Sequence, residues 1–279
     1  MSLRRSIYKT PAQLRAMVEP GLITAAALDA ARALVAPGVT TGELDAAASA
    51  VITSRGAKSN FQMVRGYRHT ICASVNEQVV HGIPGDRVLQ PGDILSVDAG
   101  AEYKGWNGDS AFTMVLDDPS RPDVVAERRR LSEVTEGSLW AGVAALATAR
   151  HLGEIGAAIQ EHIEVHAPAT GYGILREYVG HGIGRKMHES PSVFNYRVPD
   201  PGPEVRPGLV LAIEPMVVIG DQETFVEDDG WTVSTLDGTA GSHWEHSVAV
   251  HEGGIWVLTA TDGGAAGLAP FGVTPTPIA

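Results

Sequence analysis

Apolar residues along this chain alternate between helical spacing and strand-like spacing, and the order of the two repeats once. Two capping patterns, Thr10-Pro-Ala-Gln13 and Thr40-Thr-Gly-Glu43, each precede an apolar run of helical period, so each predicts a helix start. The Pro-Gly pair at Glu19-Pro-Gly21 predicts that the first helix kinks or restarts there. The predicted helices cover residues 10–36, 40–55, 124–149 and 152–165.

Short runs rich in β-branched residues lie between and after these helices and predict strands in antiparallel hairpins. The expected strands are residues 71–75, 94–99, 106–115, 209–219, 223–227, 230–235, 245–250 and 255–259. Paired helices followed by strands, in the same order in both halves, favour an α+β fold with pseudo-twofold symmetry. We expect one domain over residues 1–262, followed by a poorly ordered Gly-, Ala- and Pro-rich tail, 263–279.

An internal echo supports the duplication. The segments 91–98 and 207–214 share the pattern Pro-Gly-x-x-Leu-x-aliphatic-carboxylate and end at Asp98 and Glu214. Upstream of them, His81 and His181 each begin the tripeptide His-Gly-Ile. We expect each half of the fold to contribute one carboxylate to a common centre.

Composition narrows the class of protein. The formal net charge of the 279 residues is -12, which argues against a general affinity for nucleic acid or anionic membranes. The single cysteine, Cys72, excludes an intrachain disulfide and fits a reducing compartment, although a disulfide-free exported protein would fit as well. The first eleven residues contain no apolar signal region, and no stretch approaches 18 apolar residues, so we expect a cytoplasmic protein.

Five ionisable residues lie within apolar segments, where burial of a charged side chain is unfavourable unless it has a partner. Asp98 follows Ile94 to Val97, and Asp109 lies 11 positions later across a glycine-rich turn. A turn centred near Tyr103 and Lys104 would place the two aspartates opposite each other on one face of a hairpin, where a bound dication would offset their repulsion. For Asp109 taken alone, an exposed turn residue is the favoured interpretation, because it follows Asn107-Gly108.

His181, Glu214 and Glu245 complete the set. Glycines flank His181 and permit a close approach to a metal, although a lone histidine is more often a packed residue. Glu214 ends an apolar run before a proline, and Glu245 opens an apolar strand, where a surface position is the alternative. Four carboxylates and one imidazole suit two hard or borderline divalent ions, which would supply hydroxide near neutral pH.

Other patterns are weaker. Glycine-rich segments at 82–85 and 180–184 lack the context of a nucleotide-binding loop. Cys72 could be a nucleophile near His69 or His81, but a buried small apolar residue is the commoner case. His188, seven residues after His181, is interpreted as a donor to substrate.

Taken together, the motifs resemble type I methionine aminopeptidases of the pita-bread metallopeptidase fold over residues 5–260. They include Gly180-His-Gly-Ile-Gly184 with His188-Glu189, and Trp231-Thr-Val233. The other matching segments are Lys9-Thr-Pro11, 37–45, 74–77 with 81–84, Asp98 with Gly108-Asp109, 213–216 and Glu245-His246.

The resemblance implies a role for each matching residue. Asp98 binds one metal ion, Asp109 and Glu245 bridge both ions, and His181 and Glu214 complete the second. Glu214 also carries the proton from the nucleophilic water to the leaving amine. His188 stabilises the tetrahedral intermediate and His81 contacts substrate. The positions that line the methionine side-chain pocket are Tyr67, Cys72 and Trp231, with Met187, Phe61 and Val64 as departures from the family pattern that bear on pocket size.

The implied reaction is removal of the initiator methionine before a small second residue. The implied cofactors are two divalent ions, cobalt, manganese or iron, with zinc and nickel as further candidates. Nascent polypeptide N-termini and peptides are the implied partners and the ribosome is a further candidate; direct contact with nucleic acid or membrane is not expected, and neither is an oligomer. The rivals are an X-Pro peptidase, which usually has a histidine at the position of Glu177 and a large extra N-terminal domain, and a non-catalytic binding homologue, which usually lacks some of the ligands.

Overall fold

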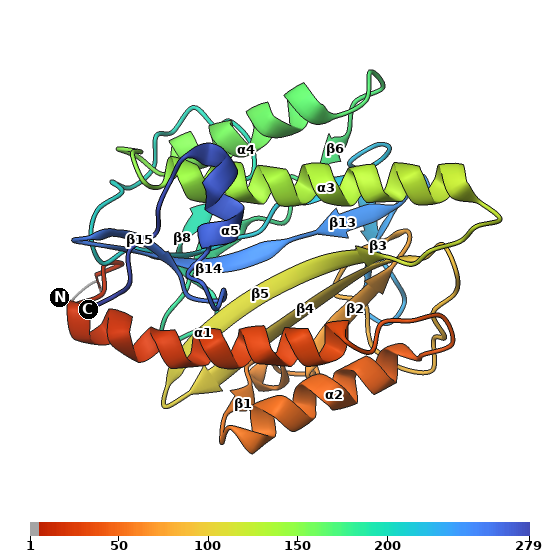
Figure 1. Ribbon diagram of the computed structural model, residues 1–279, viewed down its shortest axis with the longest axis horizontal. Helices are drawn as coiled ribbons and strands as arrows, with labels where there is room; N and C mark the ends of the chain where they lie inside the picture. The colour runs from red at the N-terminus through yellow and green to blue at the C-terminus, as the bar shows by residue number, and fades with distance from the viewer. Residues whose placement is uncertain (1–5) are drawn as a thin grey trace.

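One curved sheet, with helices on one of its faces, organises the computed structural model of this chain (Figure 1). The structure describes residues 6–279, so residues 1–5 of the expected domain lie outside the described residues. The helices are α1 Pro11–Arg32, α2 Thr41–Ser54, α3 Pro122–Ala145, α4 Gly153–His166 and α5 Ala265–Leu268, with 3-10 turns Phe61–Met63 and Ala269–Phe271.

The strands of the main sheet are β1 Lys58–Ser59, β2 Ile71–Val75, β4 Ile94–Tyr103, β5 Trp106–Val115, β7 Gly180–Gly182, β8 Glu189–Val193, β9 Val210–Ile213, β14 Glu245–His251 and β15 Gly254–Val257. Two small sheets flank it, one of β13 Gly241–His243, β10 Met216–Val218 and β6 Gly173–Ile174, the other of β11 Thr224–Val226, β12 Val233–Thr235 and β3 Gln78–Val80.

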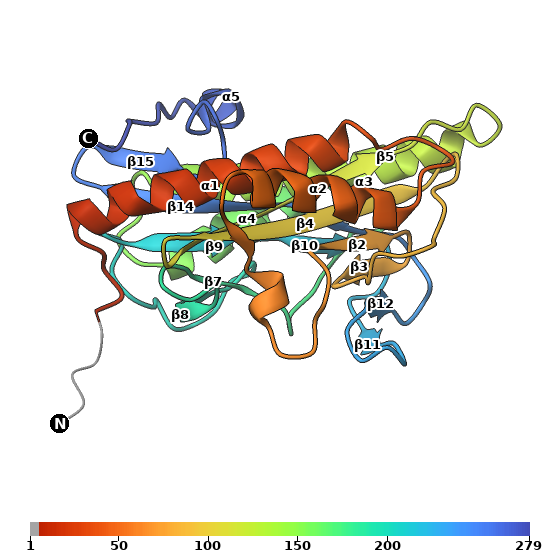
Figure 2. The ribbon, with the colours of Figure 1, turned by 90° about the horizontal axis from the view of Figure 1, so that it is seen from below.

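The order β4-β5-β14-β9 at the centre of the main sheet places one antiparallel pair from each half side by side. Helices α1 and α2 cover the β4–β5 half, and α3 and α4 cover the other half (Figures 1 and 2). The α+β class and the duplicated order predicted from the sequence are therefore confirmed.

Alternation along the central strands separates the two faces of the sheet. Leu95, Val97 and Ala99 of β4 pack into the apolar cluster with α1 and α2 residues, so Ser96 and Asp98 point to the opposite face. On that face lie the loop around the 3-10 turn at 61–63, β7 with β8, and the β11–β12 hairpin (Figure 2). The helix face is thus the core, and the other face is available for chemistry.

Of the two outcomes predicted for the N-terminal helix at Pro20, a kink or a restart, the restart is wrong, because α1 runs through Pro20. Both capping boxes, at Thr10 and Thr40, are present as predicted. Packing explains why residue 21 is glycine. A Cβ on Gly21 would lie 2.4 Å from the carbonyl oxygen of Leu258, and the Gly21 backbone lies close to Gly108 of β5. Close packing of α1 on the sheet, rather than helix termination, accounts for the glycine.

The β4–β5 hairpin also differs in register. Its turn is Lys104-Gly105, both at positive φ (51° and 78°), so Asp98 pairs with Ala111 and Gly100 with Asp109. The two aspartates are therefore diagonal neighbours rather than directly opposed, but they do lie on one face, because a shift of two residues preserves side-chain direction.

The chain after residue 262 forms α5 and a 3-10 turn, which differs from the expected poorly ordered extension. Leu268 is fully buried, and the backbone N–H of Thr276 donates to the carbonyl of Ile255. Small residues permit this packing: Gly267 lies against the ring of Trp140, where a Cβ has no room. Among the described helices, none is both long and apolar enough to cross a membrane.

Candidate metal centre

A cavity of about 150 Å³ on the sheet face opposite the helices collects the candidate residues. Its lining combines ionisable side chains at one end with apolar ones at the other. The lining residues are Phe61, Val64, Tyr67, Cys72, His81, Asp98, Asp109, His181, Met187, His188, Glu214, Trp231 and Glu245. The structure thus brings together every site residue predicted from the sequence.

The carboxylates come from four neighbouring strands or strand ends. Asp98 lies within β4, Asp109 within β5, and Glu245 begins β14, where it pairs with Ala111. Ser247 fixes the middle of this arrangement, since its hydroxyl accepts from the backbone N–H of Asp109 and donates to the carbonyl of the same residue. Central strands that pair on both sides leave these side chains little freedom.

Burial of four carboxylates in one cavity makes their ionised forms unfavourable. Burial raises the pKa of Asp98 to about 7 and that of Glu214 to about 7. Burial, and then the neighbouring carboxylates, hold the pKa values of Asp109 and Glu245 well above their usual range. These shifts describe the protein without a cation, so the arrangement calls for positive charge.

Three oxygen atoms in this group, Oδ1 of Asp98, Oδ1 of Asp109 and Oε1 of Glu245, are buried without a hydrogen-bond partner among the described residues. Ligand atoms of Asp109, His181 and Glu245 lie within 4.8 Å of one another. Unpartnered buried carboxylate oxygens are rare in folded proteins unless a cation or proton satisfies them. The donor set therefore fits divalent metal.

The ring of His181 gives a second indication. Its Nδ1 lies 3.0 Å from the carbonyl oxygen of Gly182, an atom that can only accept, so Nδ1 carries the proton. Burial lowers the pKa of His181, which keeps the ring neutral and leaves a lone pair on Nε2. That nitrogen faces Oε1 of Glu214 at 3.4 Å, so two lone pairs point at each other unless a cation or a proton lies between them.

Glu214 lies one residue beyond the end of β9, and its geometry differs from that of Asp98. Pro215 follows it, and the strand predicted as continuous over 209–219 is broken here into β9 and β10. The side-chain amide of Asn195 donates to the Glu214 carbonyl at 3.0 Å, which replaces the missing ladder bond. The break directs the Glu214 carboxylate into the cavity.

His81 and His188 lie at the edge of the cavity. His81 has a positive φ of 61°, uncommon for a residue other than glycine, and its neighbour Gly82 passes so close to Ala73 that a Cβ there would lie 2.4 Å from its carbonyl oxygen. Burial lowers the pKa of His81 to about 4. The ring of His188 contacts that of His181, with ring centroids 4.3 Å apart. Both rings are placed to contact a bound molecule.

The other end of the cavity is apolar. Phe61, Tyr67 and Cys72 form a small buried cluster against which Val64, Met187 and Trp231 pack, with the Tyr67 and Trp231 ring centroids 5.1 Å apart. The Tyr67 hydroxyl donates to the carbonyl of Ile71 at 2.7 Å, which fixes the ring. Burial raises the pKa of the Cys72 thiol well above its usual range, so a nucleophilic thiolate is disfavoured there.

His243 approaches Glu214 from outside the set of residues that line the cavity, and it was not predicted from the sequence. It is 2% exposed, and its Nε2 lies 3.6 Å from Oε2 of Glu214. Its charge state influences the pKa of both Asp98 and His81. Its position two residues before Glu245, and so on the same face as that residue, was the signal available in the sequence.

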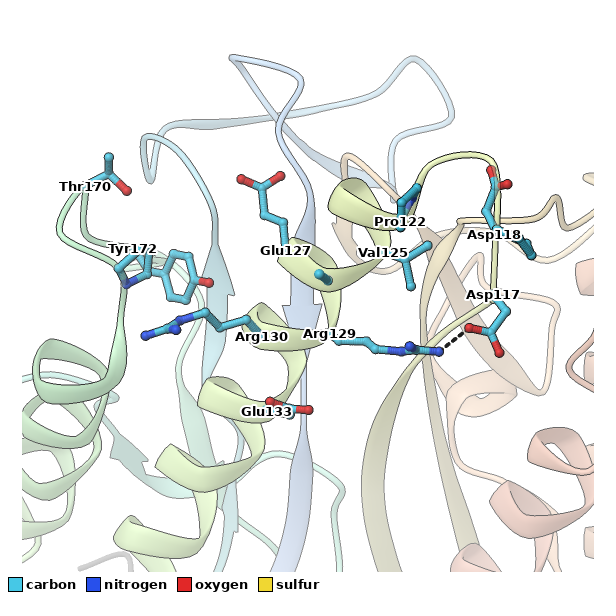
Figure 3. Close-up of a pocket in the computed structure, with 13 residues that line it drawn as sticks. Asp117, Asp118, Pro122, Val125, Glu127, Arg129, Arg130, Glu133, Thr170 and Tyr172 are labelled. Carbon is cyan, nitrogen blue, oxygen red and sulfur yellow. Dashed lines mark hydrogen bonds and ion pairs between the residues drawn. The ribbon is translucent and has the colours of Figure 1, made fainter.

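A separate surface hollow lies between the N-terminal part of α3 and the segment around Thr170 and Tyr172 (Figure 3). None of the candidate residues lines it. Arg129 is paired with Asp117, and Arg130 donates to the carbonyl of His166 at 2.8 Å. The two arginine side chains are thus engaged within the fold.

The model of metallopeptidase family M24 matches residues 15–252 of this chain. The chain belongs to metallopeptidase family M24. A relative from Bacillus subtilis, named methionine aminopeptidase 1, is 43% identical to this M24 chain over 253 residues, which is 91% of this chain and 98% of the relative. Family membership implies divalent metal ions, and the buried group of Asp109, His181 and Glu245 is a candidate site for such an ion.

Solved structures agree with this assignment. A methionine aminopeptidase from Thermotoga maritima superimposes on this M24 chain with a TM-score of 0.83 and 37% identity, covering 90% of this chain and 98% of the other. A prolidase from Pyrococcus furiosus has a TM-score of 0.69 at 21% identity, with 91% of this chain and 66% of the other covered, and shows the shared fold. The predicted pita-bread fold is confirmed.

Proposed function

We propose that this M24 chain is a methionine aminopeptidase that removes an N-terminal methionine from nascent proteins and peptides when the second residue is small. The observation that carries the proposal is the cavity itself, which joins a buried four-carboxylate, one-imidazole cluster to an apolar pocket. The Bacillus subtilis relative, 43% identical over nearly its whole length, supports the same activity.

Asp98, Asp109, His181, Glu214 and Glu245 would hold two divalent ions. Such a pair lowers the pKa of a bound water and so supplies a nucleophile near neutral pH. Carboxylate oxygens with one imidazole suit manganese, iron or cobalt better than a cysteine-rich structural zinc site. Asp109 and Glu245, on the adjacent strands β5 and β14, are the two that we assign as bridging ligands.

Glu214 is the residue that we assign to proton transfer. Its carboxylate lies in the cavity one residue beyond the end of β9, and a carboxylate positioned in this way can accept a proton from water and release it again. The neutral rings of His81 and His188 lie where they can donate to the substrate carbonyl as negative charge develops on it. These two histidines thus orient the peptide bond, and Glu214 carries the proton to the leaving amine.

The apolar end of the cavity would select the N-terminal side chain of the substrate. Tyr67, Cys72, Met187 and Trp231 present carbon and sulfur surfaces to an unbranched thioether, which adapts well to irregular apolar space. Phe61 and Val64 narrow the same end. We extend the proposal to a monomeric enzyme of the cytoplasm that acts on chains leaving the ribosome; the single cysteine and the acidic charge are compatible with that setting.

Side-by-side hydrolysis of Met-Ala-Ser and Gly-Pro peptides tests this proposal. The protein is first treated with a chelator and then supplied with Mn²⁺, Fe²⁺ or Co²⁺. Release of methionine with at least one metal, and little release from Gly-Pro, is the expected result. Faster cleavage of the proline-linked bond would favour an X-Pro peptidase, and no cleavage with any metal would favour a non-catalytic homologue.

A further inference from the structure

His243 is a buried polar residue that the ligand set proposed above does not use. The residue is 2% exposed, and its Nε2 has no hydrogen-bond partner among the described residues. A buried ring nitrogen without a partner is unfavourable, so a neighbouring group is expected to satisfy it in the working enzyme. The atom that faces it is Oε2 of Glu214, at 3.6 Å.

The backbone of His243 is fixed by the other half of the fold. Its N–H donates to the hydroxyl oxygens of Ser96 and Thr113, at 3.2 and 3.1 Å, and its carbonyl accepts from the Thr113 hydroxyl at 2.7 Å. Met216 of β10 pairs with it on the other side. This clamp between β4, β5 and β10 holds the ring beside Glu214, so the approach of the two side chains is built into the fold.

Glu214 therefore lies between two histidines with unlike hydrogen positions. His181 has its proton on Nδ1, bonded to the Gly182 carbonyl, so its Nε2 has a lone pair directed at Oε1. For His243, a proton on Nε2 would point at Oε2, an acceptor. Hydrogen bonds at active sites are often long in the absence of substrate and tighten when the site fills, so the 3.6 Å separation is compatible with a hydrogen bond in the working enzyme.

We propose that His243 is a positioning residue, whose Nε2–H holds Oε2 of Glu214 and so directs Oε1 toward His181 and the metal side of the cavity. This inference rests on the proposed function, since it concerns the carboxylate assigned to metal binding and proton transfer. Partners of this kind typically contribute about 10- to 100-fold to metal affinity or activity. His243 touches Glu214 rather than the substrate.

Replacement of His243 by Leu and by Gln separates hydrogen bonding from volume. Leu removes the donor, and Gln restores an N–H at a similar reach. On Met-Ala-Ser with saturating Mn²⁺, we expect His243→Leu to lower kcat about 10- to 100-fold with KM within about threefold. We expect His243→Gln to recover kcat to within about fivefold of the wild type. His243→Met, which also lacks a donor, replaces the Leu variant if that does not fold.

Calorimetric titration of the chelated protein with Mn²⁺ gives a readout independent of turnover. We expect His243→Leu to keep the wild-type number of bound ions and to weaken one of them about tenfold. A matched control is His162→Leu on α4, stacked on His166 away from the cavity, which should leave both kcat and Mn²⁺ affinity within about twofold.

Three results would overturn the inference. Equal loss of kcat in the Gln and Leu variants would assign the residue a packing role, and loss of one whole equivalent of Mn²⁺ in the Leu variant would make His243 a ligand. Wild-type kcat and affinity in the Leu variant would remove it from the site. A wild-type protein that cleaves nothing would reject the proposed function instead, while the Mn²⁺ titration would still decide the role of His243.

Discussion

In the first half of the sheet, β4 and β5 pair along ten residues each and Asp98 lies within a strand, whereas in the second half β9 ends at Ile213 and Glu214 lies just past it. The two carboxylates occupy matching places in the sequence echo, and burial raises both pKa values to about 7. What differs is the backbone. A ladder on both sides fixes Asp98, while a single amide from Asn195 supports Glu214. The two matching side chains thus differ in backbone support, which is compatible with the roles proposed for them, a fixed metal ligand for Asp98 and a proton carrier for Glu214.

The largest effect should come from the carboxylates themselves. Glu214→Gln keeps the shape of the side chain and removes the proton carrier, so we expect kcat to fall by about 10³-fold or more, even at saturating metal. Asp98→Asn weakens a ligand only, so its activity should rise again as Mn²⁺ is increased. Kinetics over a range of Mn²⁺ concentrations, with circular dichroism to check folding, measure this. If added Mn²⁺ restored the kcat of Glu214→Gln, the proposed difference between a proton carrier and a fixed ligand would be wrong. The same conclusion would follow if Glu214→Ala and Asp98→Ala lost activity equally and recovered equally with Mn²⁺.

The next largest effect, on stability, is expected at the two glycines of the repeated Pro-Gly pattern, which precede β4 and β9. Gly92 and Gly208 both have positive φ, 87° and 100°, which other residues adopt at a cost of about 1–3 kcal/mol. A Cβ on Gly208 would also lie 2.4 Å from the backbone oxygen of Lys9, whereas the nearest atom at Gly92 belongs to the end of the Arg121 side chain.

Replacement of each glycine by alanine should therefore have unequal effects. We expect Gly92→Ala to lower the free energy of unfolding by about 2 kcal/mol and Gly208→Ala by about 3 kcal/mol or more, because only the second clashes with backbone. Urea denaturation measures both. Equal losses of unfolding free energy in the two variants would show that Lys9 moves away from a Cβ at residue 208 at little cost. The two glycines would then be equivalent in energy.

A smaller effect is expected in the pH dependence of the metal-free protein. The folded pKa values of Asp98 and Glu214, about 7, lie above the ordinary values of 3.8 and 4.5 for these side chains, so the folded state binds more protons than the unfolded state between those limits. Their contribution to stability is complete below the unfolded pKa and is lost as pH rises through about 7. The buried histidines act in the opposite direction, since burial lowers the pKa of His81 from 6.5 to about 4, and their effect is complete above pH 6.5.

The free energy of unfolding of the chelated protein should consequently fall between pH 6.5 and 8, by on the order of 1 kcal/mol per carboxylate. Asp98→Asn and Glu214→Gln should each remove part of the fall, and Mn²⁺ should abolish it. Thermal and urea unfolding at several pH values test this. A flat profile in the chelated wild type would mean that folding raises the pKa of neither carboxylate.

Local patterns predicted much of this fold. The capping boxes at Thr10 and Thr40 depend on residues three apart, and β2 and β5 match the predicted ranges of 71–75 and 106–115. The predicted register of the β4–β5 hairpin was wrong by two residues. Its turn is Lys104-Gly105, and the sequence does not show that a lysine adopts positive φ.

Tertiary contacts explain what sequence could not predict. Pro20 stays within a helix because α1 is held against the sheet at Gly21, and the tail is ordered by contacts with β15 and Trp140. The five acidic and histidine candidates were recognisable from their apolar surroundings. His243 was missed, because its position two residues before Glu245 is a weak signal, and its partner Glu214, 29 residues earlier in the chain, meets it through the pairing of β10 with β13.

The pairing of β5 with β14 has a consequence for the order in which activity appears during synthesis. It joins Ala111 to Glu245, so the strands at the centre of the sheet meet only when most of the chain exists. The β4–β5 hairpin is local and can form early, whereas closure of a loop of more than a hundred residues is slow by comparison. Asp98 and Asp109 must therefore wait for the second half of the chain, and a partly made molecule has no complete centre with which to cleave its neighbours. Under the proposed ligand set, activity would therefore appear only late in synthesis, once Glu245 has been added and β14 has paired with β5.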